Sequence, residues 1–431
     1  MSKRAEQLDA AIEALWQELE ATPADAFEER CFALTWTWAR ERGWFSARWS
    51  ERGRAFVLVS PDRQLPEIEE RRDLIISALV DHQRPYPRAD NATSSGVCVA
   101  RGGLLLCHGL AALSDAGAGR TRSLALLLER RLQGQPTADE ERRQQGLNRL
   151  QRAAAVIAEA GGAPIDGGPF TLCPITTAQK TATWFRVCAL NPGEAPGYRR
   201  GPSAVDRLVR GLERVRSYRH PLRPTEATSA LLQRATERAR SPLKQHLEGL
   251  ADPSRFDETA LEMGAAGDFF RAILSDTWSI TQLTGPGRLD ATGARATATL
   301  DCRTMPGGQT KALSDLLHEV LGPDLQLELL GERRGKESPI HGELMRCMRE
   351  AIARHWPAAL CAPTLQTMNA DSWGWRQQAL PCYGFTPVDV APQVDPIGAW
   401  LTGGLRCDEG QRAKGRKCFV DAIEAFTGGA I

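Results

Sequence analysis

Apolar and polar positions repeat with two different periods along this chain. Residues 6–20 carry apolar side chains every three or four positions, and residues 27–43 continue that spacing, so both segments are predicted to be amphipathic helices. Residues 54–60 (RAFVLVS) form a short apolar run that stops before a proline, which is typical of a buried strand. The chain is therefore expected to begin with two helices followed by a strand.

The pattern up to residue 160 alternates between strand and helix. Residues 73–80 are amphipathic, and residues 95–112 form a glycine-punctuated apolar segment that suits a strand or loop leading into a buried helix. Residues 123–128 are predicted to form a strand. Residues 137–160 are predicted to form a helix whose first turn has capping-box spacing. This alternation is the α/β pattern, and it predicts a mostly parallel sheet.

A different order of elements follows in the middle of the chain. Strand, helix, strand, strand, helix and strand are predicted at residues 181–190, 203–215, 277–283, 296–302, 310–321 and 325–330. This order suggests a small α+β sandwich of the ferredoxin-like kind, with a helical insert at residues 221–270. The α/β pattern then returns, with helix, strand, strand and helix at residues 340–354, 364–368, 382–386 and 412–426. A small domain inserted into a larger one is therefore expected.

Several motifs occur in a fixed order in the second half of the sequence. They lie at Gly201–Val215 (GPSAVDRLVRGLERV), Thr297–Gly307 (TATLDCRTMPG), Ser338–Ile352 and Pro363–Val388, which contains YGFTPV. Together they resemble the di-zinc aminoacylase and glutamate carboxypeptidase family, which includes carboxypeptidase G, acetylornithine deacetylase and succinyl-diaminopimelate desuccinylase. The resemblance covers most of the chain and is weak before Ser123.

The resemblance implies a fold and an assembly. The implied fold class is α/β, with a zinc-peptidase-like (phosphorylase/hydrolase-like) catalytic domain at residues 1–177 and 332–431. A ferredoxin-like α+β lid, at residues 178–331, is implied as an insertion into it. Because this family uses the lid for dimerisation, a homodimer through the lid is expected.

The resemblance also implies a two-zinc centre with residues from five places, and the first two places carry unsuitable side chains. A zinc pair needs a bridging carboxylate and terminal His or carboxylate ligands. The first place, a GHxD motif after a strand, aligns with Ser60–Arg63, where Pro61 has no ligand atom and Arg63 brings a cation. The second, a bridging Asp, aligns with Val99, and the Lys after it aligns with Arg101.

The other three places are no better supplied with metal ligands. A Glu-Glu pair, one member of which acts as the general base in the family, aligns with Arg130-Arg131 or, alternatively, with Glu140-Glu141. The latter pair also fits the acidic start of a helix. The fourth ligand aligns with Asp166 in an IDGG turn, and the fifth, a His, aligns with Leu405.

Four further residues align with substrate-contacting or conserved-motif positions of the family. Glu194 and Asp290 stand where the lid supplies a His and an Asn. Arg303, from the DCR motif, and Asp371 are retained. Arg303 could bind a ligand carboxylate through two parallel hydrogen bonds, or it could form a structural ion pair with a buried acid.

These substitutions predict that no metal is bound and that no cofactor is needed, with zinc expected only if the ligands are displaced. If Arg63, Arg101, Arg130 and Arg131 shared one pocket, they would form a basic cavity for an anionic ligand. The alternative is that these arginines reach solvent.

Two cysteine positions are candidates for other chemistry. Cys98, beside the position of the bridging Asp, is a free thiol that could act as a nucleophile on an acyl group. Cys107-His108 lies in the apolar run LLLCHGLAAL and is interpreted as structural, because adjacent side chains usually point apart.

Composition limits the partners. The 431 residues contain 54 basic and 53 acidic side chains, a net charge of +1, so neither nucleic acid nor a membrane surface is expected as a partner. The 11 cysteines have no CxxC spacing, and the amphipathic N-terminal helix is not a signal peptide. A cytoplasmic location with free thiols is expected.

Three functions follow as hypotheses. The leading one is a divergent member without the two-zinc centre that binds a small anionic or acyl-amino-acid-like molecule, with a carboxylate as the expected group, or a protein partner. The second is a metal-independent enzyme that acts on amide or acyl bonds through Cys98. The third is an active zinc amidohydrolase with displaced ligands and Glu140-Glu141 as the catalytic pair.

Overall fold

The computed structural model describes most of the chain. The described residues are 3–23, 26–51, 54–62, 73–80, 95–115, 120–131, 147, 150, 152–158, 160–166, 171–190, 201–285, 295–367, 372–389 and 407–428. For residues 95–102, 130, 131 and 166, only the course of the backbone is used below. Within these ranges, no helix is both long and apolar enough to cross a membrane.

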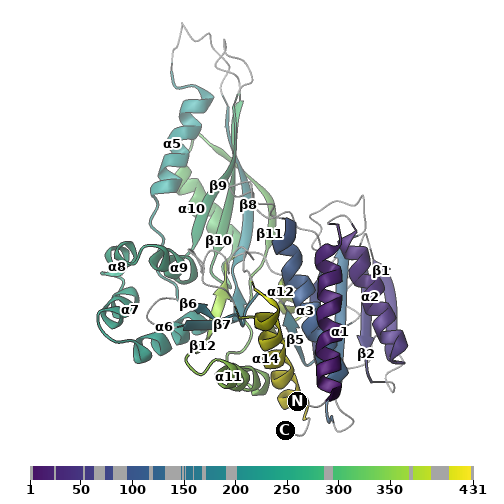
Figure 1. The fold of residues 1–431 in the computed structure, drawn as a ribbon. Helices are drawn as coiled ribbons and strands as arrows, with labels where there is room; N and C mark the ends of the chain where they lie inside the picture. Colours follow the sequence, from purple (N-terminus) through teal and green to yellow (C-terminus); the bar gives the residue numbers. More distant parts are fainter. Residues whose placement is uncertain are drawn as a thin grey trace.

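A large mixed sheet forms the base of the molecule (Figure 1). Its strands are β1 (Phe45–Glu51), β2 (Arg54–Ser60), β3 (Leu74–Leu79), β4 (Leu124–Arg131), β5 (Ala155–Ala158), β6 (Ile165–Asp166), β7 (Thr171–Gln179), β12 (Leu360–Gln366) and β13 (Cys382–Gly384). The order is β1-β2-β4-β3-β5-β13-β7-β12, with β6 beside β7. Strands β4, β3, β5 and β13 are parallel to one another, whereas β2 and β7 run against their neighbours β4 and β13.

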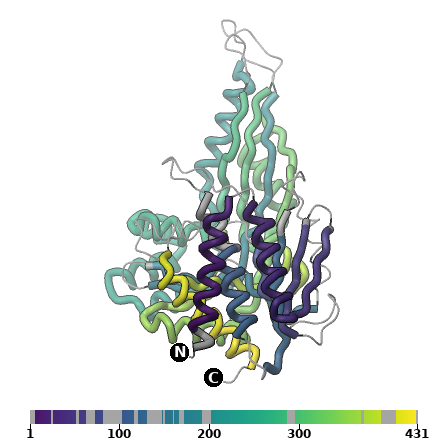
Figure 2. Tube along the Cα trace, turned by 45° about the vertical axis from the view of Figure 1, so that its right-hand side comes forward, coloured from purple at the N-terminus to yellow at the C-terminus, as the bar shows by residue number. Residues whose placement is uncertain are grey.

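Helices cover the large sheet on both faces. On one face α1 (Lys3–Ala21), α2 (Phe27–Glu41), α3 (Ser95–Asp115), α11 (Glu343–His355) and α14 (Glu409–Thr427) contribute to one apolar core. The short α12 (Ser372–Gln377) and the side chains of Leu147, Leu150 and Ala153 contribute to a separate core on the other face. Figure 2 shows α1 and α2 standing in front of the sheet, with the two chain ends close together below.

Three sequence expectations for this part of the chain need correction. Residues 73–80 contain the buried strand β3 rather than an amphipathic segment, because both faces of the strand are covered. Residues 95–112 are helical throughout, within α3. The expected helix at 137–160 ends in a strand, β5, and its proposed start lies outside the described residues.

The second sheet has four antiparallel strands and a core of its own. The strands are β8 (Thr181–Leu190), β9 (Thr277–Thr284), β10 (Arg295–Thr304) and β11 (Gln326–Arg333), in the order β11-β8-β10-β9. Helices α5 (Ala204–Ser217) and α10 (Thr310–Leu321) pack on one face. The order of strands and helices predicted for the ferredoxin-like unit is confirmed.

The helical insert lies with the large sheet. Helices α6 (Glu226–Arg238), α7 (Leu243–Ala251), α8 (Phe256–Glu262) and α9 (Ala265–Leu274) bury their apolar faces in the same core as α1, α3 and α14. A chain segment expected within the lid thus packs on the base. The division into domains at residues 177/178 and 331/332 remains a proposal.

Candidate functional site

The end of β2 does not lie where the first zinc-ligand motif was expected. The Ser60 hydroxyl donates a hydrogen bond to the Leu124 carbonyl oxygen (2.6 Å), and the Asp62 carboxylate accepts one from the Leu124 amide (2.9 Å). Leu124 begins β4, whereas Arg130-Arg131 end it, about 23 Å further along the strand. Ser60 and Asp62, described members of the segment aligned with the first ligand motif, thus bind the start of β4.

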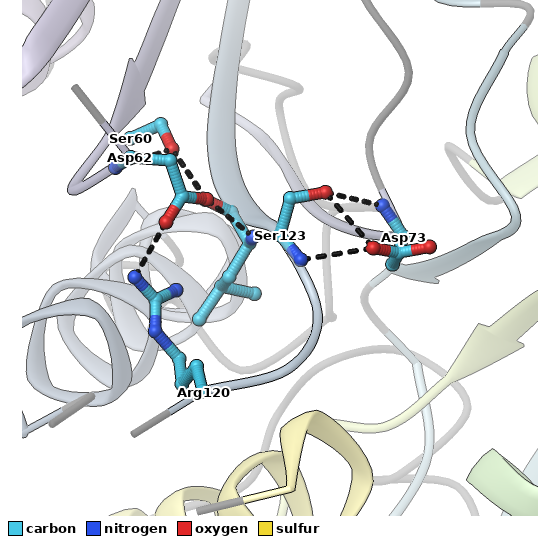
Figure 3. A network of polar contacts seen from close by, with 6 residues as sticks. Ser60, Asp62, Asp73, Arg120 and Ser123 are labelled. Carbon is cyan, nitrogen blue, oxygen red and sulfur yellow. Dashed lines mark hydrogen bonds and ion pairs between the residues drawn. The ribbon is translucent and has the colours of Figure 1, made fainter. Parts of the chain in front are cut away.

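A network of polar contacts explains what Asp62 does instead (Figure 3). Arg120 donates to the Asp62 carboxylate at 2.6 Å, and Asp73 accepts hydrogen bonds from the amide and the hydroxyl of Ser123 at 2.9 and 3.1 Å. The network ties the end of β2 to the starts of β3 and β4. Arg63 lies outside the described residues, so the basic cavity expected from Arg63, Arg101, Arg130 and Arg131 remains a prediction.

The strand order draws attention to two strand ends that the sequence alignment did not use. Strand β3, not β2, precedes α3 and pairs in parallel with β4 and β5. In the sequence, β3 is followed by Val80 and then Asp81-His82, and β5 is followed directly by Glu159. Asp81, His82 and Glu159 lie outside the described residues. The signal for them was the apolar run LIISAL before Asp-His, which is buried on both faces and so shows no strand alternation.

The structure also describes how this edge of the sheet is held. Thr386 and Phe385, from the YGFTPV motif, donate backbone hydrogen bonds to the carbonyl oxygens of Gly161 (2.7 Å) and Ala158 (3.0 Å). Ala160 between them has a positive φ of 76°, a conformation that is costly for a side chain with a Cβ. A Cβ on Gly161 would lie 2.0 Å from the Gly384 carbonyl oxygen, so only glycine fits there. Close packing and backbone hydrogen bonds thus explain why the sequence YGFTPV suits this place in the fold.

Cys107-His108 has the structural role that was expected. Both side chains are buried, and His108 Nε2 lies 2.7 Å from the Pro387 carbonyl oxygen, which fixes the end of the YGFTPV segment. Burial raises the pKa of the Cys107 thiol to about 12 and lowers the pKa of His108 to about 3. A neutral thiol beside a neutral imidazole with no access to solvent does not form a nucleophilic pair.

The described residues at this edge offer no donor set for two zinc ions. Val99 and Arg101, which the alignment sets at the positions of the bridging Asp and the following Lys, lie in the first two turns of α3, and Arg130-Arg131, which it sets at the acidic pair, end β4. Among the described residues, no group of three His, Cys, Asp or Glu side chains is placed to hold a metal ion. The buried Glu129 of β4 is engaged in a polar interaction.

Arg303 lies on the face of the four-stranded sheet opposite to α5 and α10. Positions 296, 298, 300 and 302 of β10 are buried against the helices, so Asp301 and Arg303 face the other way. Arg303 donates two hydrogen bonds to Asp301, from Nε to Oδ1 (2.6 Å) and from Nη2 to Oδ2 (2.8 Å). The guanidinium carbons of Arg303 and Arg333 lie 5.6 and 5.4 Å from the ring centre of Trp184. Asp301 and Trp184 thus hold the Arg303 guanidinium in a fixed orientation.

The other predicted site residues have no described side chains. Glu140, Glu141, Glu194, Asp290 and Asp371 lie outside the described residues. For Cys98 and Arg101, only their place in the first two turns of α3 is known. Asp408 caps α14 with Glu409 in its first turn, so that pair starts a helix.

Comparison with solved structures decides the fold family. The dipeptidase Dug1p from Saccharomyces cerevisiae matches with a TM-score of 0.65 and 10% identity over 99% of this chain and 98% of that chain. Human carnosine dipeptidase 1 matches with a TM-score of 0.64 and 11% identity over 99% of both chains. YXEP from Bacillus subtilis, a dinuclear metal-binding peptidase of the M20 family, matches with a TM-score of 0.55 and 11% identity over 99% and 100%. The chain has the M20 peptidase fold.

This result confirms the resemblance inferred from the motifs at the level of the fold. No protein-family model and no curated protein sequence matches this chain. In this fold, the DCR motif lies in β10 and the YGFTPV motif begins in β13.

Proposed function

We propose that this chain binds a small carboxylate-bearing molecule of the acyl-amino-acid class through Arg303, and that it does so without a two-zinc centre. The observation that carries the proposal is the orientation of the Arg303 guanidinium by Asp301 on the sheet face opposite to α5 and α10. In Figure 1 those helices lie on the left of this sheet, and α3 and α1 lie on its right.

The chemistry of this face favours an anion. A guanidinium presents a planar set of N–H donors that matches a carboxylate, and it stays charged at all relevant pH values. The Arg303 side chain is only 14% exposed and is paired with Asp301, so a ligand carboxylate would share the guanidinium with Asp301 in a poorly solvated place. Arg333, on the other side of Trp184, adds a second positive charge to the same face.

A second candidate function has one specific observation in its favour. In the sequence, Asp81-His82 follow β3 after Val80 and Glu159 follows β5, and these are residue types that bind zinc. An amidohydrolase with displaced zinc ligands is therefore the alternative, and zinc content separates the two. The Cys98 hypothesis gains no support from the position of that residue in α3 and remains a prediction.

Ligand binding can be measured directly. N-acetyl-L-amino acids, and the matching amides that lack the carboxylate, are titrated into the protein by calorimetry. We expect the acids to bind and the amides to bind at least tenfold more weakly, because charge-assisted hydrogen bonds contribute about 1.5–3 kcal/mol. Arg303→Met should weaken binding of the acids by about 10- to 100-fold.

Arg186→Met is the matched control for this experiment. Arg186 lies on the same sheet face, is 40% exposed and pairs with Glu328 at 2.8 Å, so its removal should leave affinity within twofold. Equal binding of acids and amides, or equal losses in the two variants, would contradict the proposal. Circular dichroism spectra and melting temperatures show whether each variant is folded.

We also propose that the four-stranded sheet forms a homodimer through its β9 edge. Strand β9 (TWSITQLT) carries no charge that would discourage pairing with another strand. Ile280 and Leu283 on β9 are 42% and 61% exposed, and Val205 and Val209 on the neighbouring α5 are 38% and 52% exposed. Light scattering should give a dimer for the wild type and a monomer for Leu283→Lys. A wild-type protein that is monomeric at micromolar concentration would contradict the proposed dimer.

A further inference from the structure

Lys180 occupies a single-residue link between the two sheets. It follows β7 and precedes β8, and only 1% of it is exposed. Its amide donates to the Gln366 carbonyl oxygen at the end of β12 (3.0 Å). Its Nζ donates to the Ser275 carbonyl oxygen (2.7 Å) and to Thr277 Oγ1 (3.2 Å). One lysine therefore connects the large sheet to the start of β9.

The second chain connection between the sheets runs beside the first. The Gly335 amide donates to Thr181 Oγ1 (2.9 Å), and the Gln179 amide donates to the Lys336 carbonyl oxygen (3.2 Å). Figure 1 shows β8 rising from this crossing at the base of the four-stranded sheet. Any change in the angle between the small sheet and the large one must bend these two segments. The hydrogen bonds of the Lys180 amine hold the start of β9 against them.

Several charged groups surround the Lys180 amine. Burial lowers its pKa to about 7, the Asp276 carboxylate before β9 raises it, and Arg303 on β10 lowers it. The His220 ring packs edge-on against Trp278 on β9, and burial lowers the pKa of His220 to about 4, so that ring is neutral near pH 7.

The second connecting segment carries two more charges close to the crossing. Lys336 Nζ donates to the Gln377 carbonyl oxygen (3.3 Å), and burial raises the pKa of Glu337. Asp276 accepts a hydrogen bond from the Met305 amide (2.7 Å), which holds its carboxylate in place. Lys180 is thus a buried amine at this crossing, with a pKa that burial brings close to neutrality.

We infer that Lys180 is a proton-operated latch, and that proton uptake by its amine favours an opened arrangement in which the start of β9 leaves the crossing. The sign follows from linkage. A buried ammonium is disfavoured, whereas an opened arrangement lets water solvate it, so the opened form binds the proton more tightly. Acidification therefore weakens the attachment of the start of β9 to Lys180, and a pH above neutrality strengthens it.

Hydrogen exchange tests the latch in the intact protein. The amides of β9 are compared with those of β3, as protection factors corrected for intrinsic exchange, at pH 6.5 and pH 8.5. We expect the β9 protection relative to β3 to be at least threefold lower at pH 6.5, with about 25-fold as the ceiling for an amine that moves fully into water. An unchanged ratio would overturn the inference.

Two variants locate the effect at the amine. Lys180→Met keeps the length and apolar character of the stem and should reduce the pH effect to less than twofold. Thr277→Val removes one acceptor of Nζ and should lower β9 protection at both pH values while keeping the pH effect. An equal pH effect in Lys180→Met would overturn the inference, and if that variant does not fold, the wild-type comparison still decides.

Discussion

The junction between the two sheets allows a sharp test at Gly335. A Cβ at this position would lie 2.0 Å from the Gln179 carbonyl oxygen, 2.5 Å from the Lys180 carbonyl carbon and 2.6 Å from the Thr181 nitrogen. All three are backbone atoms of the other connecting segment, so no side chain can rotate away. Gly335→Ala must therefore push the two segments apart.

The cost follows from what the displacement breaks. Separation of the segments weakens the hydrogen bonds from Gly335 to Thr181 and from Gln179 to Lys336, at about 1 kcal/mol each. Overpacking against rigid backbone adds about 1–3 kcal/mol. The lower entropy of the unfolded chain returns about 0.4–1 kcal/mol. The variant should therefore lose about 3 kcal/mol of unfolding free energy.

Urea unfolding of Gly335→Ala measures this loss, and Gly285→Ala is the matched control. Nothing lies within 4 Å of a Cβ at Gly285, and neither glycine has a positive φ. The control should change the unfolding free energy by less than about 0.5 kcal/mol. A loss below about 1 kcal/mol in Gly335→Ala would mean that the two segments are not pressed together as described.

Three further predictions follow from buried polar groups. Trp375→Phe should lose about 2–4 kcal/mol of unfolding free energy, because it removes the 2.9 Å hydrogen bond from Nε1 to the buried Ser77 hydroxyl and leaves that hydroxyl unpaired; a loss below 1 kcal/mol in urea unfolding would argue against it. Wild-type stability should rise by about 2 kcal/mol relative to Lys180→Met between pH 6.5 and 8.5, because the pKa of Lys180 is about 7 when folded and 10.5 when unfolded. Parallel stability curves for the two proteins would refute this. Cys107, whose pKa burial raises to about 12, should be alkylated at least tenfold more slowly in the native protein than in urea, as mass spectrometry of the modified peptides can show. Comparable rates in the two states would show that Cys107 is not buried as described.

Much of the fold could be predicted from the sequence. The alternation in TATWFRVCAL and the amphipathic helices around residues 203–215 and 310–321 identified the small sheet and its two helices, because each helix buries only one face and β8 alternates between buried and half-buried positions at residues 183–187. Strands β3 and β5 were missed, because β3 is covered on both faces and β5 has only four buried residues at the end of a segment with helical spacing.

The site could be predicted only in part. Arg303 was identified from its motif, and its partner Asp301 lies two positions away, the spacing that places both on one face of a strand. The alignment of Ser60–Arg63 could not take strand direction into account, because the sequence does not show in which direction a strand runs through a sheet, and β2 runs against β4. Lys180 was overlooked, although a charged residue between two apolar strands was visible in TLCPITTAQKTATWF.

Metal analysis tests the central claim, that an M20 fold here operates without its two-metal centre. The protein is incubated with zinc, desalted, and its zinc content is measured by mass spectrometry beside that of an M20 dipeptidase treated identically. The account predicts well below one zinc ion per chain and unchanged unfolding in a chelator. About two tightly held zinc ions per chain, lost together with stability in the chelator, would contradict it.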